Sequence, residues 1–160
     1  MTAPSSVPDE PHAARPGAAH PGTVQADTAQ PRRSGTGNRA LAELFGYRIV
    51  SFGEGRCVVE WTPAPPFVNA AGGVWGGAVS AVVDNVCAMS VAAALDPPPR
   101  HLPTVSMHVD FLRPLAVGGT YLLNGHALRV GGRLAVADTH VMDADEQLLA
   151  RATCTFSVRR

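Results

Sequence analysis

A single carboxylate, Asp84, interrupts an otherwise uncharged and mostly apolar run from Gly76 to Leu95. We expect this run to form one long helix, which ends at Asp96 because the three prolines that follow cannot continue it. A helix that is apolar on most sides belongs inside a protein. An ionised carboxylate buried there is costly unless a partner satisfies it or its pKa rises. Because proteins keep such groups mostly where chemistry needs them, Asp84 is the first candidate functional residue.

The composition indicates one domain with enough apolar residues for a core, since the chain has 160 residues and is 46% hydrophobic. Its formal net charge of zero gives no electrostatic footprint for nucleic acid or an anionic membrane. The small residues and the acid of the 76–95 run argue against a membrane-spanning helix, and the N-terminus lacks the apolar core of a signal peptide. The three cysteines are scattered, without metal-ligand spacing. We therefore expect a reduced, cytoplasmic protein without a metal or redox cofactor.

The chain divides near residue 37. Residues 1–36 are rich in Pro, Ala, Ser, Thr and Gly without a periodic apolar pattern, and this composition predicts a disordered tail. We expect the domain to span 37–160, opening with a short helix over Arg39–Phe45 that Asn38 caps and Gly46 ends. Glycine-containing turns such as Gly53-Glu54-Gly55, which suits a hairpin, divide six further runs that resemble strands. These runs are Tyr47–Phe52, Arg56–Thr62, Thr104–Leu112, Thr120–Val130, Leu134–Met142 and Leu148–Val158.

Two strands, one long helix and four more strands predict an α+β fold. A single helix of this length fits one antiparallel sheet that curls around it. On the helix, one stripe would pack into the sheet, and it comprises Val79, Val82, Val86, Met89 and Ala93. The side of Asp84 is mostly small, with Gly77, Ser80, Ala81, Ala88 and Val91. Small residues allow close approach, so this side is expected to receive a substrate, a second copy of the helix, or both.

The residues around Asp84 allow two interpretations of its role, one structural and one catalytic. Asp84 could cap a neighbouring loop or pair with an arginine from a strand. Alternatively, it could act in catalysis together with the start of its helix, where Gly76 and Gly77 supply backbone amides suited to a developing oxyanion. Asn69 lies just upstream and adds a neutral donor and acceptor. A diglycine could equally give simple loop flexibility.

The spacing of these residues resembles a known family. The stretch from Asn69 to Asp84 places an Asn, a diglycine and a helical acid at the intervals found in hotdog-fold thioesterases of the phenylacetyl-CoA type, within the 4-hydroxybenzoyl-CoA thioesterase superfamily. The runs Val105–Pro114 and Asp145–Val158 are similar to two strands of that family. The resemblance covers residues 38–158 and implies a hotdog fold, in which the sheet wraps around one central helix.

The resemblance also implies roles for individual residues. Asp84 would act on the thioester as nucleophile or as general base for water, and the Gly76 amide would polarise the carbonyl. Asn69 would help hold the thioester or the water, and Thr104 would position water. Gly77 would line the substrate site.

The family also implies partners. Its members form dimers through a continuous sheet, often paired into tetramers, with active sites at subunit interfaces. Basic side chains near that interface hold the phosphates of coenzyme A, and the candidates here are Arg113, Arg129 and Arg133.

Trp75 departs from the family pattern, which has a histidine before the diglycine. Tryptophan cannot accept a hydrogen bond or carry a proton, but its N–H can donate and its ring can pack on a flat acyl group. Trp75 is therefore expected to bind substrate, with a changed way of orienting the carbonyl.

Three functions follow as hypotheses. The first is hydrolysis of an acyl-CoA, or of an acyl-carrier-protein thioester. The second is a non-catalytic hotdog module that binds acyl-CoA or another small ligand, since the Trp75 ring could fill the pocket. The third is a hydratase or dehydratase, which would need a histidine in the site. This third option is weak because the strand alternation turns His108 away from the helix, and His126 and His140 have the pattern of ordinary strand residues.

Overall fold

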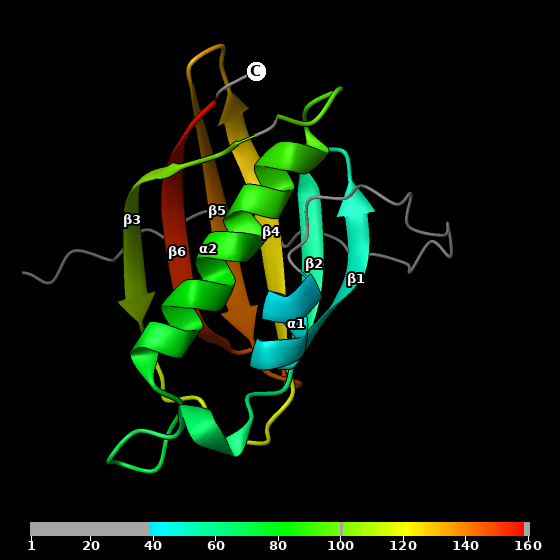
Figure 1. Cartoon of the computed structure of the whole chain (residues 1–160). Coiled ribbons are helices and arrows are strands. Elements are labelled where there is room, and N and C mark those ends of the chain that lie inside the picture. Colours follow the sequence, from blue (N-terminus) through cyan, green and yellow to red (C-terminus); the bar gives the residue numbers. More distant parts are fainter. Residues whose placement is uncertain (1–38, 100, 159–160) are drawn as a thin grey trace, which may run out of the picture.

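The computed structural model describes residues 39–99 and 101–158 (Figure 1). The tail predicted over residues 1–36 and the predicted N-cap Asn38 lie outside the described residues. Within them the elements are α1 (Arg39–Phe45), β1 (Tyr47–Gly53), β2 (Arg56–Trp61), the short 3-10 helix η1 (Pro65–Phe67), α2 (Gly76–Ala93), β3 (Thr104–Phe111), β4 (Tyr121–Val130), β5 (Leu134–Met142) and β6 (Leu148–Ser157).

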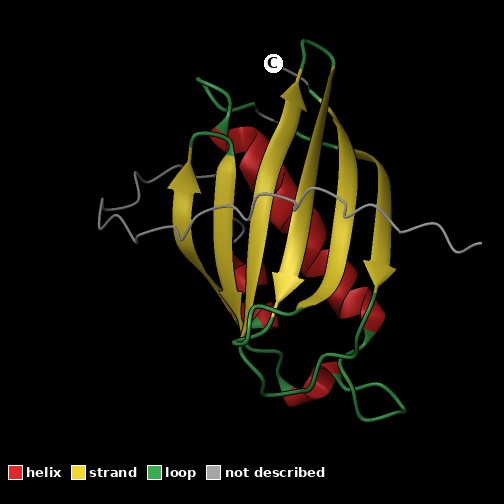
Figure 2. Cartoon of the chain, turned by 180° about the vertical axis from the view of Figure 1, so that it is seen from behind, coloured by secondary structure: helices red, strands yellow, loops and turns green. Residues whose placement is uncertain are grey.

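The six strands form one antiparallel sheet in the order β1-β2-β4-β5-β6-β3. Helix α2 lies diagonally across one face of this sheet, and the view from behind shows the other face of the strands in front of it (Figure 2). The predicted α+β architecture, an antiparallel sheet around one long helix, is confirmed. The two edge strands are β1 and β3, and β3 lies beside the start of α2.

Short local signals set the strand connections as the sequence predicts. Glu54 and Gly55 both have positive φ, 51° and 73°, and they form the two-residue turn between β1 and β2. The pairing of Gly53 with Arg56 closes this hairpin. Gly46 ends α1 at φ 77°, and its amide donates to the carbonyl of Ala42 at 2.9 Å.

The valine stripe of α2 packs into the sheet. Val79, Val82 and Val86 are at most 1% exposed, and each such burial contributes about 1.5–3 kcal/mol. Gly125 of β4 allows the helix this close, because a Cβ there would lie 2.4 Å from Ser90 Oγ. The core of the domain therefore lies between α2 and the inner face of the sheet.

The side of α2 that carries Asp84 is less buried than its apolar sequence predicts. Asp84, Ser80 and Ala81 are only half-buried, so the expectation of a fully buried carboxylate is wrong. Val91 differs in the other direction: it is fully buried, in a second apolar cluster against which Leu102 packs. The open part of this side is thus confined to the first two-thirds of the helix.

By length and mean hydropathy (1.4), α2 also qualifies as a candidate membrane span, contrary to the expectation from sequence. However, 56% of this window is buried inside the fold, and core helices commonly pass the same test. Packing against the sheet is therefore sufficient to explain why this helix is apolar.

Candidate active site

Asp84 and Thr104 form one pair across the fold. Thr104, the first residue of β3, donates its hydroxyl hydrogen to Asp84 Oδ1 on α2 at 2.8 Å. Within the described part of the chain, Asp84 forms no ion pair, and its carboxylate accepts a hydrogen bond from Thr104 alone, so neither the arginine partner nor the loop cap left open above is present there. The carboxylate thus has one neutral donor, and its half-buried position leaves it accessible to water.

A β-bulge places Thr104 on the helix side of the sheet. Met107 pairs with Cys154, and since directly opposed residues share a face, both side chains lie on the inner face. Regular alternation from Met107 would turn Thr104 outward. The register shifts between Thr104 and Ser106, however, and Thr104 pairs with the buried Phe156. The irregularity at this point of the edge strand therefore positions the hydroxyl over Asp84.

His108 lies on the outer face, as the alternation predicts. It pairs with Thr153, and its side chain is 79% exposed. Its Nε2 lies 3.0 Å from Asp110 Oδ1, and Arg151 Nε donates to the other oxygen of that carboxylate at 2.8 Å. These hydrogen bonds, from Arg151 first and then His108, lower the pKa of Asp110. This cluster is separated from Asp84 by the sheet, so it supplies no histidine to the site.

The loop before α2 holds the start of the helix in place. Val74 N–H donates to the carbonyl of Leu115 at 2.8 Å, and Trp75 N–H donates to the carbonyl of Phe67 at 2.7 Å. Inside the helix, the amides of Ala78 and Val79 both donate to the carbonyl of Trp75.

The first two amides of the helix donate no hydrogen bond. Among the hydrogen bonds of residues 39–99 and 101–158, none is donated by Gly76 N–H or Gly77 N–H. Two adjacent free amides at a positive helix end form a site for negative charge. This is the feature that an oxyanion donor requires.

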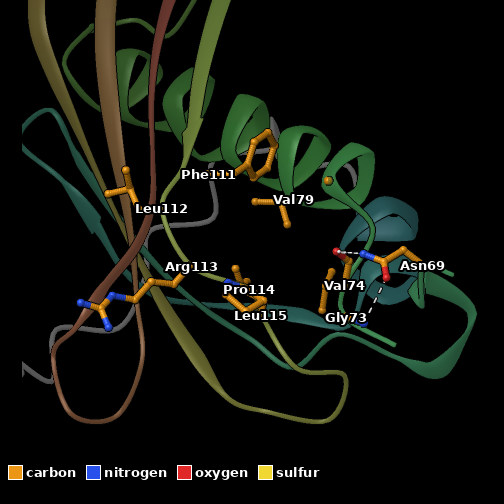
Figure 3. Close-up of a pocket in the computed structure, with 10 residues that line it drawn as sticks. Asn69, Gly73, Val74, Val79, Phe111, Leu112, Arg113, Pro114 and Leu115 are labelled. Atoms are coloured by element: carbon orange, nitrogen blue, oxygen red, sulfur yellow. Dashed lines mark hydrogen bonds between the residues drawn. The ribbon is translucent and has the colours of Figure 1, made fainter. Parts of the chain in front are cut away.

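Asn69 organises the same loop. Its Oδ1 accepts hydrogen bonds from the amides of Ala71 and Gly73, at 2.9 and 3.1 Å. Its Nδ2 donates to the carbonyl of Val74 at 3.2 Å (Figure 3). Both ends of the side-chain amide are therefore bonded within the loop, and only the second Nδ2 hydrogen is left for a ligand. The structure gives Asn69 a positioning role, and its contact with substrate stays a prediction.

A surface pocket of about 340 Å³ opens beside the start of α2 (Figure 3). Asn69, Gly76 and Phe111 line it, together with Val79 and Arg113. The ring of Phe111 covers Gly76 so closely that a Cβ there would lie 3.3 Å from it. The guanidinium of Arg113 extends outward and donates to Gln147 Oε1 at 3.1 Å. The pocket is thus lined by Gly76, whose amide is free, by the ring of Phe111 and by the cationic residue Arg113.

Phe111 is the site residue that sequence reasoning missed. Its alternation with Val109 and Met107 indicates a core residue, and the resemblance marks it only as the aromatic at the end of a strand. In the structure it is 53% exposed because β3 is an edge strand. An aromatic at the end of an edge strand, next to a helix start, is the signal that could have identified it.

The other predicted cations lie away from this pocket. Strand β3 begins at Thr104 and ends at Phe111, and Arg113 lies two residues beyond that second end, beside the pocket. Arg133 lies in the β4–β5 hairpin at the Thr104 end of the sheet, where its carbonyl accepts from Val158 N–H. Arg129, near the end of β4, is exposed. The structure therefore brings only Arg113 to the pocket, and the roles of the other two stay predictions.

Gly76 and Asp84 do not meet within one chain. They are eight residues apart on the same helix, and at 1.5 Å per residue this separation is about 12 Å. Asp84 accordingly is not among the residues that line the pocket at Gly76. One thioester carbonyl cannot contact both groups of a single copy, since reacting atoms must approach within about 3.5 Å.

Comparisons with known proteins agree with this fold. The sequence profile described as "Thioesterase superfamily" matches residues 71–150. A Saccharolobus solfataricus protein that carries a provisional name as an esterase is 27% identical over 123 residues, 75% of this chain and 84% of its own.

Two solved structures show the same fold. The Escherichia coli PaaI protein, from the phenylacetic acid degradation operon, has a TM-score of 0.69 at 24% identity and covers 77% of this chain and 86% of its own. The zebrafish thioesterase superfamily member 2 has a TM-score of 0.68 at 22% identity, with coverages of 75% and 91%.

The profile match spans half of the chain and includes Gly76, Gly77, Asp84 and Thr104. The chain therefore belongs to the thioesterase superfamily and has the hotdog fold. This membership supports thioester hydrolysis as its general activity.

Proposed function

We propose that the protein hydrolyses acyl thioesters of coenzyme A to a free acid and CoA. The observation that supports this most is the accessible carboxylate of Asp84, oriented by the Thr104 hydroxyl, on a helix that begins with the two free amides of Gly76 and Gly77. A carboxylate and an oxyanion donor are the two groups that acyl transfer to water needs.

In the proposed reaction, Asp84 acts as general base or as nucleophile. As base, its free Oδ2 takes a proton from water while the water oxygen bonds to the thioester carbon. The carbonyl oxygen becomes an oxyanion and accepts a hydrogen bond from Gly76 N–H. The C–S bond then breaks, and the thiolate of CoA takes the proton from Asp84. As nucleophile, Asp84 would attack the thioester carbon and form a mixed anhydride, while the C–S bond breaks and the released CoA thiolate takes a proton from water. Hydrolysis of the anhydride then gives the free acid and restores the Asp84 carboxylate.

The separation of Gly76 from Asp84 leads us to place each active site between two copies of the chain. Two α2 helices that lie antiparallel would bring Gly76 of one copy to Asp84 of its partner, because the small residues on that side permit close approach. The open edge of β3 favours the same assembly. On this edge strand Val105 and Met107 are 59% and 40% exposed, and an unpaired edge strand readily pairs with another chain.

The proposed assembly is a homodimer or a homotetramer of such dimers. Arg113, beside the pocket, is the first candidate to bind a CoA phosphate, and Arg133 is a second. An acyl-carrier-protein thioester is the alternative form of the substrate. The three cysteines are free and buried, which suits the proposed cytoplasmic location.

The alternative function is a module that binds acyl-CoA without hydrolysing it. Trp75 favours this alternative, since the family has a histidine at its position and the indole cannot carry a proton.

Thiol release separates the two functions. Aromatic, short-chain and medium-chain acyl-CoAs would be tested with the wild type and with Asp84→Ala, and Asp84→Asn serves as the variant of matched size. We expect release from at least one acyl class by the wild type and a loss of about 10²–10⁴-fold in both variants. Tight binding without release by the wild type would favour the binding module, and full activity of Asp84→Ala would refute the proposed role of Asp84.

A further inference from the structure

Trp75 is the exposed one of two tryptophans in the described residues. Trp61 is completely buried, and its Nε1 donates to the carbonyl of Phe45 at 2.8 Å. Trp75 directly precedes α2, and the residue is 58% exposed. A large aromatic side chain with this exposure, next to the free amides of a helix start, needs an explanation that core packing does not give.

The indole ring of Trp75 lies over Gly77. A Cβ on Gly77 would approach ring atoms Cζ2, Cε2 and Cη2 of Trp75 to 2.4, 2.6 and 2.7 Å. Only a residue without a side chain leaves room for the ring in this place. Gly77 therefore fixes where the indole lies, in addition to offering its amide.

This position puts the ring at one end of an open strip on α2. Gly77 and Asp84 are seven residues apart, which places them on the same side of the helix and separates them by about 10 Å. Ser80 and Ala81 lie between them and are half-buried. The second exposed ring, Phe111, covers the neighbouring Gly76. Two aromatic rings thus flank the first turn, whose first two amides, those of Gly76 and Gly77, are free.

We propose that Trp75 is a specificity-determining residue, whose indole face stacks on a planar acyl group of the thioester bound at the start of α2. This inference rests on the proposed function and names the acyl contact of the same site. A planar, conjugated acyl group gains offset stacking on the ring, whereas a flexible alkyl chain gains only apolar burial. The expected preference from this contact is about two- to tenfold.

The first test measures binding without catalysis. Two non-hydrolysable thioethers, S-benzyl-CoA and S-hexyl-CoA, are titrated into the wild type while tryptophan emission and its quenching by acrylamide are followed. Because Trp61 is buried, the quenchable signal belongs to Trp75, and a Trp75→Leu variant gives the Trp61 background. We expect S-benzyl-CoA to protect Trp75 from acrylamide and to bind more tightly than S-hexyl-CoA. Binding of S-benzyl-CoA with Trp75 still fully quenchable would overturn the inference.

The second test is a cycle of variants that uses Gly77. Gly77→Ala displaces the indole by its Cβ, and Trp75→Leu removes the ring, so both should lower the ratio of kcat/KM for an aromatic over an alkyl acyl-CoA by about two- to tenfold. Trp75→Phe, which keeps a flat ring, should retain most of the preference. In the Trp75→Leu background, Gly77→Ala should change the ratio no further.

The outcomes of the cycle distinguish this inference from the proposed function. If the wild type hydrolyses thioesters and Trp75→Leu leaves the ratio unchanged, the specificity role is wrong while the hydrolase remains. If Trp75→Leu instead converts the oligomer to monomers by sedimentation, the ring is an interface residue and the inference is also wrong. If S-benzyl-CoA protects Trp75 but the wild type hydrolyses no thioester, the stacking contact is supported and only the proposed hydrolase activity is refuted.

Discussion

The hydroxyl of Thr104 donates a hydrogen bond to Asp84 Oδ1 at 2.8 Å, and a bulge at the start of β3 turns the hydroxyl toward the helix. This bond joins the edge strand to the central helix at the one carboxylate of α2. It leaves Oδ2 for a water molecule or a thioester, so Thr104 fixes the direction from which Asp84 can act.

Removing this hydroxyl should reduce catalysis without unfolding the protein. Thr104→Val keeps the shape of the side chain and loses the bond, so we expect kcat to fall about tenfold to a hundredfold, the range for a hydrogen bond to a charged group. Thr104→Ser keeps the hydroxyl and should retain most of the activity. The measurement is kcat on the best thioester, with the unfolding midpoint as a control. Equal activity in Thr104→Val and the wild type would remove Thr104 from the site.

The main role of Asn69 should be to stabilise the loop before α2. Asn69→Ala leaves the amides of Ala71 and Gly73 without their acceptor, and we expect it to lower the free energy of unfolding by about 1–3 kcal/mol. Asn69→Asp keeps this acceptor and should be more stable than Asn69→Ala, as urea unfolding can measure. Its negative charge beside the oxyanion site should still lower kcat. If Asn69→Ala is as stable as the wild type, the positioning role is wrong.

The buried thiols should be unreactive in the folded protein. Burial raises the pKa of Cys57 from 9.0 to about 12, and a hydrogen bond with Cys154 together with burial raises the pKa of Cys87. A thiol reagent at pH 8 should therefore modify neither of them until the protein unfolds. Rapid labelling of the native protein would contradict the buried positions.

The same shift makes stability depend on pH. The unfolded state loses the Cys57 proton near pH 9 and the folded state near pH 12, so the stabilisation is complete below pH 9 and declines as the pH rises toward 12. Cys57→Ala should show a shallower decline of the unfolding free energy over this interval. Some slope will remain, because the pKa values of Cys87 and Tyr47 are raised as well.

The sequence predicted the elements well because their signals are local. The prolines after Asp96, the glycine turns and the alternation of Val109 with Phe111 each act over a few residues, and the strand bounds differ from the structure by one residue at most. The spacing of Gly76 and Asp84 likewise reflects one helix. The features that the sequence did not predict depend on contacts between segments that are distant in the chain.

Three particulars show this limit. The bulge that turns Thr104 inward arises from pairing with β6, and alternation within β3 predicts the opposite face. Val91 was expected on the open side, but the cluster that includes Leu102 covers it. The bonds of Asn69 depend on the loop returning to Gly73 and Val74, which residue type and spacing do not indicate.

The central claim is that each active site combines Gly76 of one copy with Asp84 of another. A variant that lacks only the amide donor is Gly76→Pro, since proline is favoured at the first position of a helix and has no N–H. Trp75, the preceding residue, already has extended angles that proline tolerates, φ −62° and ψ 128°. Gly76→Ala adds the same Cβ against Phe111 but keeps the N–H. We expect Gly76→Pro to be folded and inactive, and Gly76→Ala to remain active.

The most direct measurement mixes two inactive variants, Gly76→Pro and Asp84→Asn, by co-refolding in equal amounts. If the site is shared, a mixed dimer has one site with both native residues and one with neither. Half of the dimers are mixed, so the account predicts recovery of about a quarter of the wild-type activity. Activity that stays at the sum of the two separate variants would contradict the shared site and place Gly76 and Asp84 in different steps or different roles.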